Sequence, residues 1–309
     1  MAVTSITAFA QAIQSALQSA ALKNLRDDLV WADRSLAEVG SFTEGTDTLQ
    51  FRAYPDLSIT TPLTPLTEAT PPSARTISME VTLVGTHQYG DLVSISDLVK
   101  TLAPSDVPAV AAERVRRTAA EVMDRVARDA IFIGGTVFFA SADHSTRATL
   151  DNTDFMAGSY LIQLRSKAKK MNIPTFPDGS YRLYCSQEVA YDLQRDTTDD
   201  TSWLDVNKYA SPDTIIAGEI GKLHGVRIIG VNRAPTVSSS VTVHQSALVG
   251  NIRGWGMGDL QTLQFFYTPP GGVGDELHQK QSVGWKCMWG AGVLNNGYFL
   301  RVESYASTL

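Results

Sequence analysis

The chain has 309 residues, with 26 basic and 32 acidic side chains and a formal net charge of −6. Apolar residues make up 43% of it, which is enough for packed cores and excludes disordered, collagen-like and disulfide-scaffold proteins. The acidic balance argues against a free-standing DNA-binding protein, because phosphate neutralisation needs clustered lysine and arginine. Cys185 and Cys287 stand far apart and outside any CxxC motif, so we expect both to be reduced, half-buried apolar residues.

The N-terminal segment, residues 5–30, has the apolar spacing of a helix. Its uncharged part lacks the basic start of an export signal, and no apolar run reaches the ~20 residues that span a bilayer, so no membrane is predicted. Two interpretations of this helix stay open: it packs on its own domain, or it is an arm that docks on another subunit. The narrow apolar stripe consists of Ile6, Phe9, Ile13, Leu17 and Ala20.

Two segments, 49–53 and 77–83, alternate apolar and polar residues and are predicted to be strands. The segment between them is too rich in proline for a central sheet and shows no helical period. It is predicted to be a stiff hairpin that reaches away from the body, which implies a neighbour. Its prolines are Pro55, Pro62, Pro65, Pro71 and Pro72.

A long helix is predicted over residues 105–132, with Ser105 or Asp106 as its cap. At ~1.5 Å per residue it would be a rod of ~40 Å. It is either a solvated surface helix or a spine on which several layers are mounted. Acid–base pairs four residues apart are expected along its polar face: Glu113 with Arg117, Glu121 with Arg125, and Asp124 with Arg128.

The region after residue 155 has the pattern of a compact α/β unit. The expected elements are a helix at 160–168, a strand at 181–185, a helix at 187–193, a helix turn from 218 leading through Gly225 into a buried strand at 226–231, and a strand at 241–249. Alternation at 283–289 and 298–302 predicts late strands. We expect these to join the early strands around 77–95, which would make residues 155–260 an insertion.

No catalytic, cofactor-binding or metal-binding residue is predicted. The segment GEIGKLHG at 218–225 has two residues, not four, between its first glycines, and Leu223 follows Lys222 where a phosphate-binding loop needs Ser or Thr. GWGMGD at 254–259 is expected to be a glycine-rich turn. The five histidines are scattered, and the acids at 199–200 are expected to be solvated. A hydrolase whose triad assembles only in space is the one enzymatic hypothesis left open.

Five segments, in their order and spacing, resemble the major capsid proteins of tailed bacteriophages with the Hong Kong 97-type fold. They are LRDDLVWAD at 25–33, TTPLTPLTEATPP at 60–72, QYGDLVSISDL at 88–98, MDRVARDAIF at 123–132 and GEIGKLHGVRIIG at 218–230.

The resemblance implies an α+β chain. Its parts would be an N-terminal arm (1–40), an extended β-hairpin loop (41–85), a peripheral domain (86–150 and 261–309) with the spine helix at about 105–132, and an inserted axial domain (151–260).

The resemblance implies a structural protein of the virion, not an enzyme. Copies would assemble in the bacterial cytoplasm into an icosahedral shell of pentamers and hexamers around packaged double-stranded DNA, which the shell would contact without sequence specificity. Further partners would be a separate scaffolding protein, a portal protein at one vertex, and a decoration or cement protein. An encapsulin-like compartment shell is the alternative. Relatives that cross-link through a Lys–Asn bond use the extended loop, but residues 46–76 hold no lysine. Candidate inter-subunit contacts are Phe9, Ile13, Leu17, Pro62, Pro65, Pro71, Glu113, Arg117 and Arg125.

Overall fold

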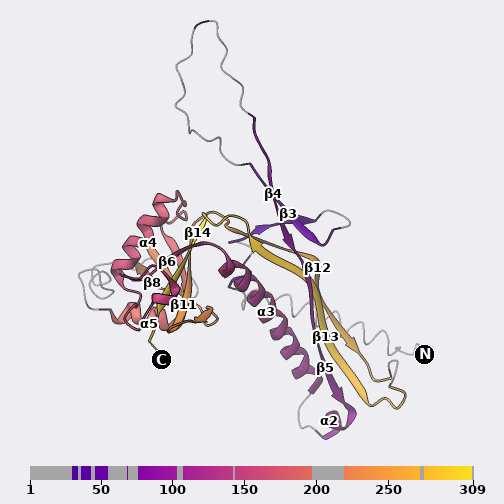
Figure 1. Ribbon diagram of the computed structural model, residues 1–309. Helices are drawn as coiled ribbons and strands as arrows, with labels where there is room; N and C mark the ends of the chain where they lie inside the picture. The colour runs from indigo at the N-terminus through magenta and orange to yellow at the C-terminus, as the bar shows by residue number, and fades with distance from the viewer. Residues whose placement is uncertain are drawn as a thin grey trace.

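The computed structural model describes the chain in segments: residues 30–33, 36–42, 46–54, 68, 76–102, 107–141, 143–196, 219–271 and 275–307. Within these, Figure 1 shows an elongated body of long strands with one long helix, a second α/β body beside it, and a small sheet at the junction. The predicted N-terminal helix, the proline-rich part of the loop, the helix cap at 105–106 and the acids at 199–200 lie outside the described residues. No helix in the described part is both long enough and apolar enough to cross a bilayer.

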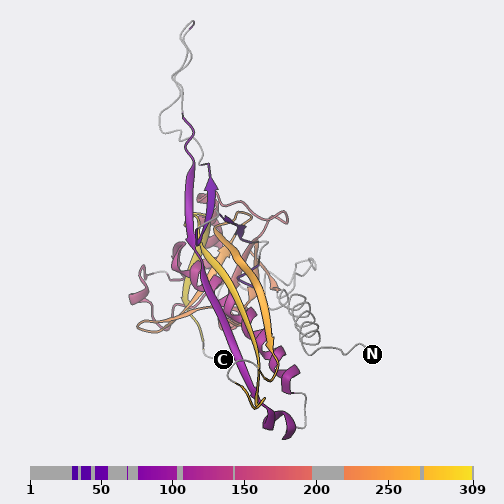
Figure 2. The same cartoon turned by 90° about the vertical axis from the view of Figure 1, so that its right-hand side faces the viewer.

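The elongated body is a four-stranded sheet in the order β1-β12-β13-β5, with the long helix α3 against one face. Figure 2 shows its three long strands side by side. Alternate residues of β13, including Val283, Trp285 and Cys287, belong to the core cluster shared with α3. The elements are β1 (Glu38–Val39), β5 (His87–Ser96), α2 (Asp97–Leu102), α3 (Val107–Ile133), β12 (Trp255–Thr268) and β13 (Lys280–Val293).

The second body is a seven-stranded sheet in the order β6-β14-β11-β7-β9-β8, with β10 paired to β11. Helices α4 and α5 share one core with the sheet, to which they contribute Leu161, Leu164 and Val189. The elements are β6 (Thr136–Phe139), the 3-10 turn η2 (Arg147–Thr149), α4 (Gly158–Lys170), β7 (Tyr181–Cys185), α5 (Gln187–Arg195), β8 (Glu219–Leu223), β9 (Val226–Gly230), β10 (Thr236–Ser238), β11 (Thr242–Val249) and β14 (Phe299–Tyr305).

The small sheet, in the order β2-β3-β4, forms the base of the predicted loop. It confirms the two strands expected near 49–53 and 77–83, and β3 pairs antiparallel with β4 from Thr48↔Gly85 to Ala53↔Glu80. Its strands are β2 (Ser41–Phe42), β3 (Thr48–Ala53) and β4 (Glu80–Gly85).

The predicted long helix is confirmed as α3, which has 27 residues. The predicted spacing of its ion pairs is wrong, since none of the three pairs forms within the described residues. Glu121 instead pairs with Arg233 at 2.7 Å, and Arg125 lies 3.8 Å from Asp129. Asp124 is not on the solvated face at all: it is buried, because it binds backbone N–H groups of the N-terminal segment.

Two further predictions of local structure are wrong. The helix turn expected from residue 218 is strand β8, because His224 (φ 49°) and Gly225 (φ 78°) form a two-residue hairpin turn that needs positive φ at both positions. The last strand also joins a different sheet. Although β13 pairs with β5 as expected, β14 lies between β6 and β11 in the seven-stranded sheet. The domain boundaries themselves stay a prediction.

Candidate assembly surfaces

Two pairs of glycines make a flat patch on the four-stranded sheet. Gly256 of β12 lies opposite Gly292 of β13, and Gly258 lies opposite Gly290. The sequence GWGMGD was expected to be a turn, and this is wrong, since Trp255 to Asp259 belong to β12. A strand interior that lacks side chains at paired positions allows another element to approach its backbone closely.

The element that approaches is the base of the loop. A Cβ atom on Gly256 would lie 2.3 Å from the ring of Phe51, and one on Gly258 would lie 2.8 Å from Leu49. On β4, Val84 fills the corresponding space above Gly292 at 2.8 Å. Leu49, Phe51 and Val84 form a small core of their own. The patch, which we call the glycine socket, thus fixes where the loop leaves the body.

Beyond the socket, the loop carries an apolar stripe that faces solvent. The alternation predicted at 77–83 exists, but the apolar side chains are on the open side while Val84 points into the body. Exposed apolar patches on a soluble chain mark interaction sites more often than isolated exposed residues do. The exposed fractions are 70% for Ile77, 48% for Met79, 45% for Val81 and 59% for Leu83.

The N-terminal segment is fastened to the long helix by one carboxylate. Asp124 Oδ1 accepts hydrogen bonds from the backbone N–H groups of Val30 (2.9 Å), Trp31 (2.6 Å) and Ala32 (3.3 Å). Burial raises the pKa of the Asp124 carboxyl, and these three bonds, with the Arg233 charge, offset only part of that rise. Sequence spacing could not identify this role, because the partner groups are backbone atoms more than 90 residues away.

Trp31 joins the two bodies. Its indole is 1% exposed and packs edge-on against Phe132 of α3, with ring centroids 5.1 Å apart, and against Tyr184 of β7 at 5.7 Å. Because α3 packs on the four-stranded sheet and β7 belongs to the seven-stranded sheet, Trp31 holds the residues directly after the predicted N-terminal helix at the junction of the two bodies. Asp124 and Trp31 together therefore fix the place at which the N-terminal segment meets the two bodies.

The described residues include only some of the predicted contact residues. Glu113, Arg117 and Arg125 lie exposed on α3. The other six lie outside the described residues: Phe9, Ile13, Leu17, Pro62, Pro65 and Pro71.

A serine and a histidine do meet in space, as the hydrolase hypothesis requires. Ser186 Oγ lies 3.0 Å from His244 Nδ1, and burial lowers the pKa of His244 despite the nearby carboxylates of Glu188 and Asp192. However, Ser186 is the N-cap of α5, where its Oγ accepts from the backbone N–H of Val189. Ser186 and His244 are both buried, so the geometry is that of a helix cap and not of a nucleophile open to substrate.

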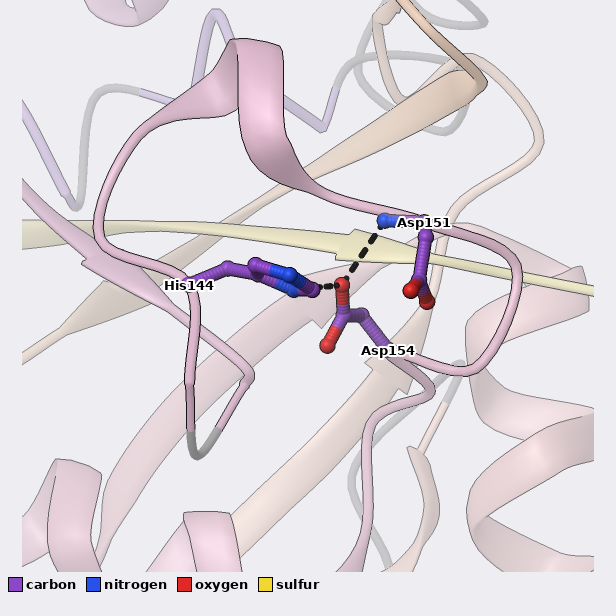
Figure 3. A group of neighbouring side chains, drawn as sticks. All are labelled: His144, Asp151 and Asp154. Carbon is purple, nitrogen blue, oxygen red and sulfur yellow. Dashed lines mark hydrogen bonds and ion pairs between the residues drawn. The ribbon is translucent and has the colours of Figure 1, made fainter.

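One histidine lies beside two acids, which sequence spacing did not reveal. His144 Nδ1 and the backbone N–H of Asp151 both lie 2.8 Å from Asp154 Oδ2 (Figure 3). Asp151 Oδ1 accepts from the hydroxyl and N–H of Thr153, which lower its pKa. The three candidate ligand atoms lie within 4.8 Å of one another, but their hydrogen bonds already account for the arrangement. We assign the group to holding the loop after β6 in shape.

A buried ionic cluster holds the last strand. Glu303 of β14 accepts a bidentate hydrogen bond from Arg147, another from Gln245 Nε2 at 3.0 Å, and lies 3.2 Å from Arg301 Nε. Burial alone would raise the pKa of Glu303, but the hydrogen bonds and the two arginine charges lower it on balance. Gln245 and Glu303 are also direct cross-strand partners in β11 and β14, so the cluster ties the loop around η2 to the sheet centre.

No protein-family model matches the sequence, and no curated protein matches it. Solved structures do match along most of the chain. The capsid of Ralstonia phage GP4 aligns with a TM-score of 0.67 at 12% identity, covering 91% of this chain and 88% of that one. The capsid of cyanophage P-SCSP1u aligns at 0.63 and 17% identity, covering 90% and 89%.

A third match is the capsid asymmetric unit of cyanophage Pam1, with a TM-score of 0.64 at 16% identity, covering 85% of this chain and 86% of that one. At such low identity the likeness shows the fold alone. The chain therefore has the α+β fold of phage capsid proteins, the fold that its sequence resemblance implies.

Proposed function

We propose that this chain is the major capsid protein of a tailed bacteriophage, a structural protein without enzymatic activity. Its copies form pentamers and hexamers that close into an icosahedral shell around packaged double-stranded DNA. The observation that carries this proposal is the loop base. The glycine socket directs a segment with four exposed apolar side chains, Ile77 to Leu83, away from the body, so one copy alone leaves apolar surface in water that a second copy can cover.

In this proposal residues 1–40 are the N-terminal arm and 41–85 the extended loop. Residues 86–150 and 261–309 form the peripheral domain, and 151–260 form the axial domain that meets its copies at the symmetry axes. The two sheets support a division into two bodies. The seven-stranded sheet also contains β6 and β14, which come from the residues before and after the proposed axial domain. Exposed charges on α3, such as Glu113, Arg117 and Arg125, would meet complementary charges of neighbouring copies.

A scaffolding protein, a portal protein at one vertex and a decoration or cement protein are the other proposed partners. Assembly in the bacterial cytoplasm and final location in the virion complete the proposal. Since the proline-rich loop holds no lysine between residues 46 and 76, shell strength would come from overlapping arms or a cement protein and not from a Lys–Asn bond in the loop.

The test is to express the full chain, alone and with its neighbouring genes, and to image the product by electron microscopy with sedimentation analysis. We expect closed shells or sheets of pentamers and hexamers. Monomers or small dimers under every condition would contradict the proposal. Particles that contain a protein cargo and exclude nucleic acid would identify a compartment shell instead.

A further inference from the structure

A basic recess lies in the second body, between α4 and the turn that joins β8 to β9. Its volume is about 320 Å³, and it contains two cationic side chains, a hydroxyl and an imidazole, with no carboxylate in its lining. It is lined by Ile162, Arg165, Ser166, Lys169 and His224. This composition suits an anion and not a cation or an apolar group.

The hairpin turn places the arginine of this recess. Arg165 Nη1 donates to the backbone carbonyl of His224 at 3.1 Å, and a Cβ atom on Gly225 would lie 3.1 Å from the guanidinium carbon. The positive φ angles of the turn thus let its backbone support the side chain closely. Lys169 follows Arg165 by four residues, so both project from the same face of α4.

The two cations are not neutralised within the described part of the chain. Neither Arg165 nor Lys169 forms an ion pair there, whereas Arg147, Arg227 and Arg301 each have a carboxylate partner. A guanidinium held in place without a counter-charge is ready to accept an external anion.

The sequence around the recess is also positively charged. Residues 155–177 contain four basic and no acidic residues, in a chain whose net charge is −6. Lys167 turns away to the carbonyl of Val137, but Lys169 and Lys170 are exposed. Interaction with the helix dipole explains lysines in the last turn of α4, but it does not explain an arginine in the middle of the helix.

We propose that this recess binds the phosphate groups of duplex DNA, without reading its sequence. The inference rests on the proposed function, in which the shell encloses DNA. Arg165 would hold one phosphate through its planar donors, and Lys169 would contact the next as a point charge. Because the two cations lie one helical turn apart on α4, the recess fits successive phosphates of a polymer backbone better than a single free nucleotide.

The experiment measures binding of the full-length chain to a short duplex by fluorescence anisotropy at a series of salt concentrations. The test variant is Arg165→Gln with Lys169→Gln. Its matched control, Arg195→Gln with Lys280→Gln, removes the same charge at exposed positions of α5 and β13. Losing two phosphate contacts should reduce the slope of log K against log salt by about 1.8, from ~0.9 per contact, and weaken binding about tenfold at ~0.1 M salt. The control should shift binding less than about twofold.

Equal slopes for wild type, test variant and control would overturn the proposal. So would an unchanged slope together with altered shell assembly in the absence of DNA, because the recess would then meet an acidic face of a neighbouring copy. Imaging the same samples separates the two proposals. Shells with an unchanged slope would leave the capsid function standing without this site, while a reduced slope in a chain that never forms shells would leave the site without the capsid function.

Discussion

Replacing Asp124 tests whether one carboxylate fastens the N-terminal segment to the long helix. In Asp124→Ala, the buried N–H groups of Trp31 and Ala32 and the half-buried one of Val30 lose their acceptor. Each buried donor left without a partner costs about 1–3 kcal/mol. Part of this loss is offset, because the variant no longer buries a carboxylate whose pKa is raised by burial. We expect a loss of about 3 kcal/mol in the free energy of unfolding.

Asp124→Asn separates the acceptor from the charge. The amide oxygen can still accept the three N–H groups, so we expect a loss of about 1 kcal/mol or less. Urea unfolding gives the free energies, and hydrogen exchange at the Trp31 and Ala32 amides reports the local change, which should be a large loss of protection in Asp124→Ala only. An Asp124→Ala variant as stable as wild type, or an Asn variant as damaged as the Ala variant, would refute this role for the acceptor.

The same carboxyl predicts the direction of a pH effect. Because the pKa of Asp124 is higher in the folded than in the unfolded chain, the ionised group is a cost to folding at neutral pH. This cost is relieved as the pH falls through the raised pKa. Wild type should therefore gain stability relative to Asp124→Asn on acidification, and a relative loss over that range would contradict the burial argument.

Three other predictions follow from the fold. Glu303→Gln should cost about 2 kcal/mol by leaving two half-buried arginine charges without their carboxylate. Because the pKa of Glu303 is lowered, wild type should lose this advantage as the pH falls through that pKa, which urea unfolding at two pH values would show. Val81→Asp with Leu83→Asp should change the unfolding free energy by less than about 0.5 kcal/mol yet abolish shells in electron micrographs, and normal shells would exclude the stripe as a contact. Gly256→Ala should cost about 1–3 kcal/mol by overpacking against Phe51, and Phe51→Leu in the same chain should recover part of it, whereas purely additive losses would rule out the contact.

The elements that sequence patterns predicted correctly are those whose pattern is local. The helices α3, α4 and α5 and the strand β13 each bury one face against a neighbour, so a period of 3.6 or 2 is visible along the chain. Strands β7 and β11 are buried at nearly every position and are marked by short apolar runs instead. Strand β8 was wrongly predicted to be a helix turn. Its pairing with β9 depends on a two-residue turn, and His224-Gly225 is a less familiar turn sequence than Asn-Gly.

Asp124 and Glu303 could not be assigned from spacing, because their partners are distant in the chain. On a helix, an acid four residues before an arginine is normally a solvated pair. Asp124 fits that pattern with Arg128, yet its carboxylate is turned to the N-terminal segment. The packing of Trp31 between Phe132 and Tyr184 helps to hold those N–H groups within reach. The role therefore depends on tertiary contacts that no local pattern records.

The glycine socket and the apolar stripe show the limit of periodicity most clearly, because each reverses its usual meaning. Paired glycines normally weaken a strand, but here they make room for Phe51 and Leu49. Alternating apolar residues normally mark a buried face, but Val81 and Leu83 face water in the isolated chain. Under the proposed function both follow from one cause: the socket holds the base of the loop in place, and a second copy covers the stripe. In the proposed shell Val81 and Leu83 of β4 would be buried, as the apolar side chains of an alternating strand usually are, although they are exposed in the single chain. Such a strand is expected when selection acts on the assembled particle and not on the single chain alone.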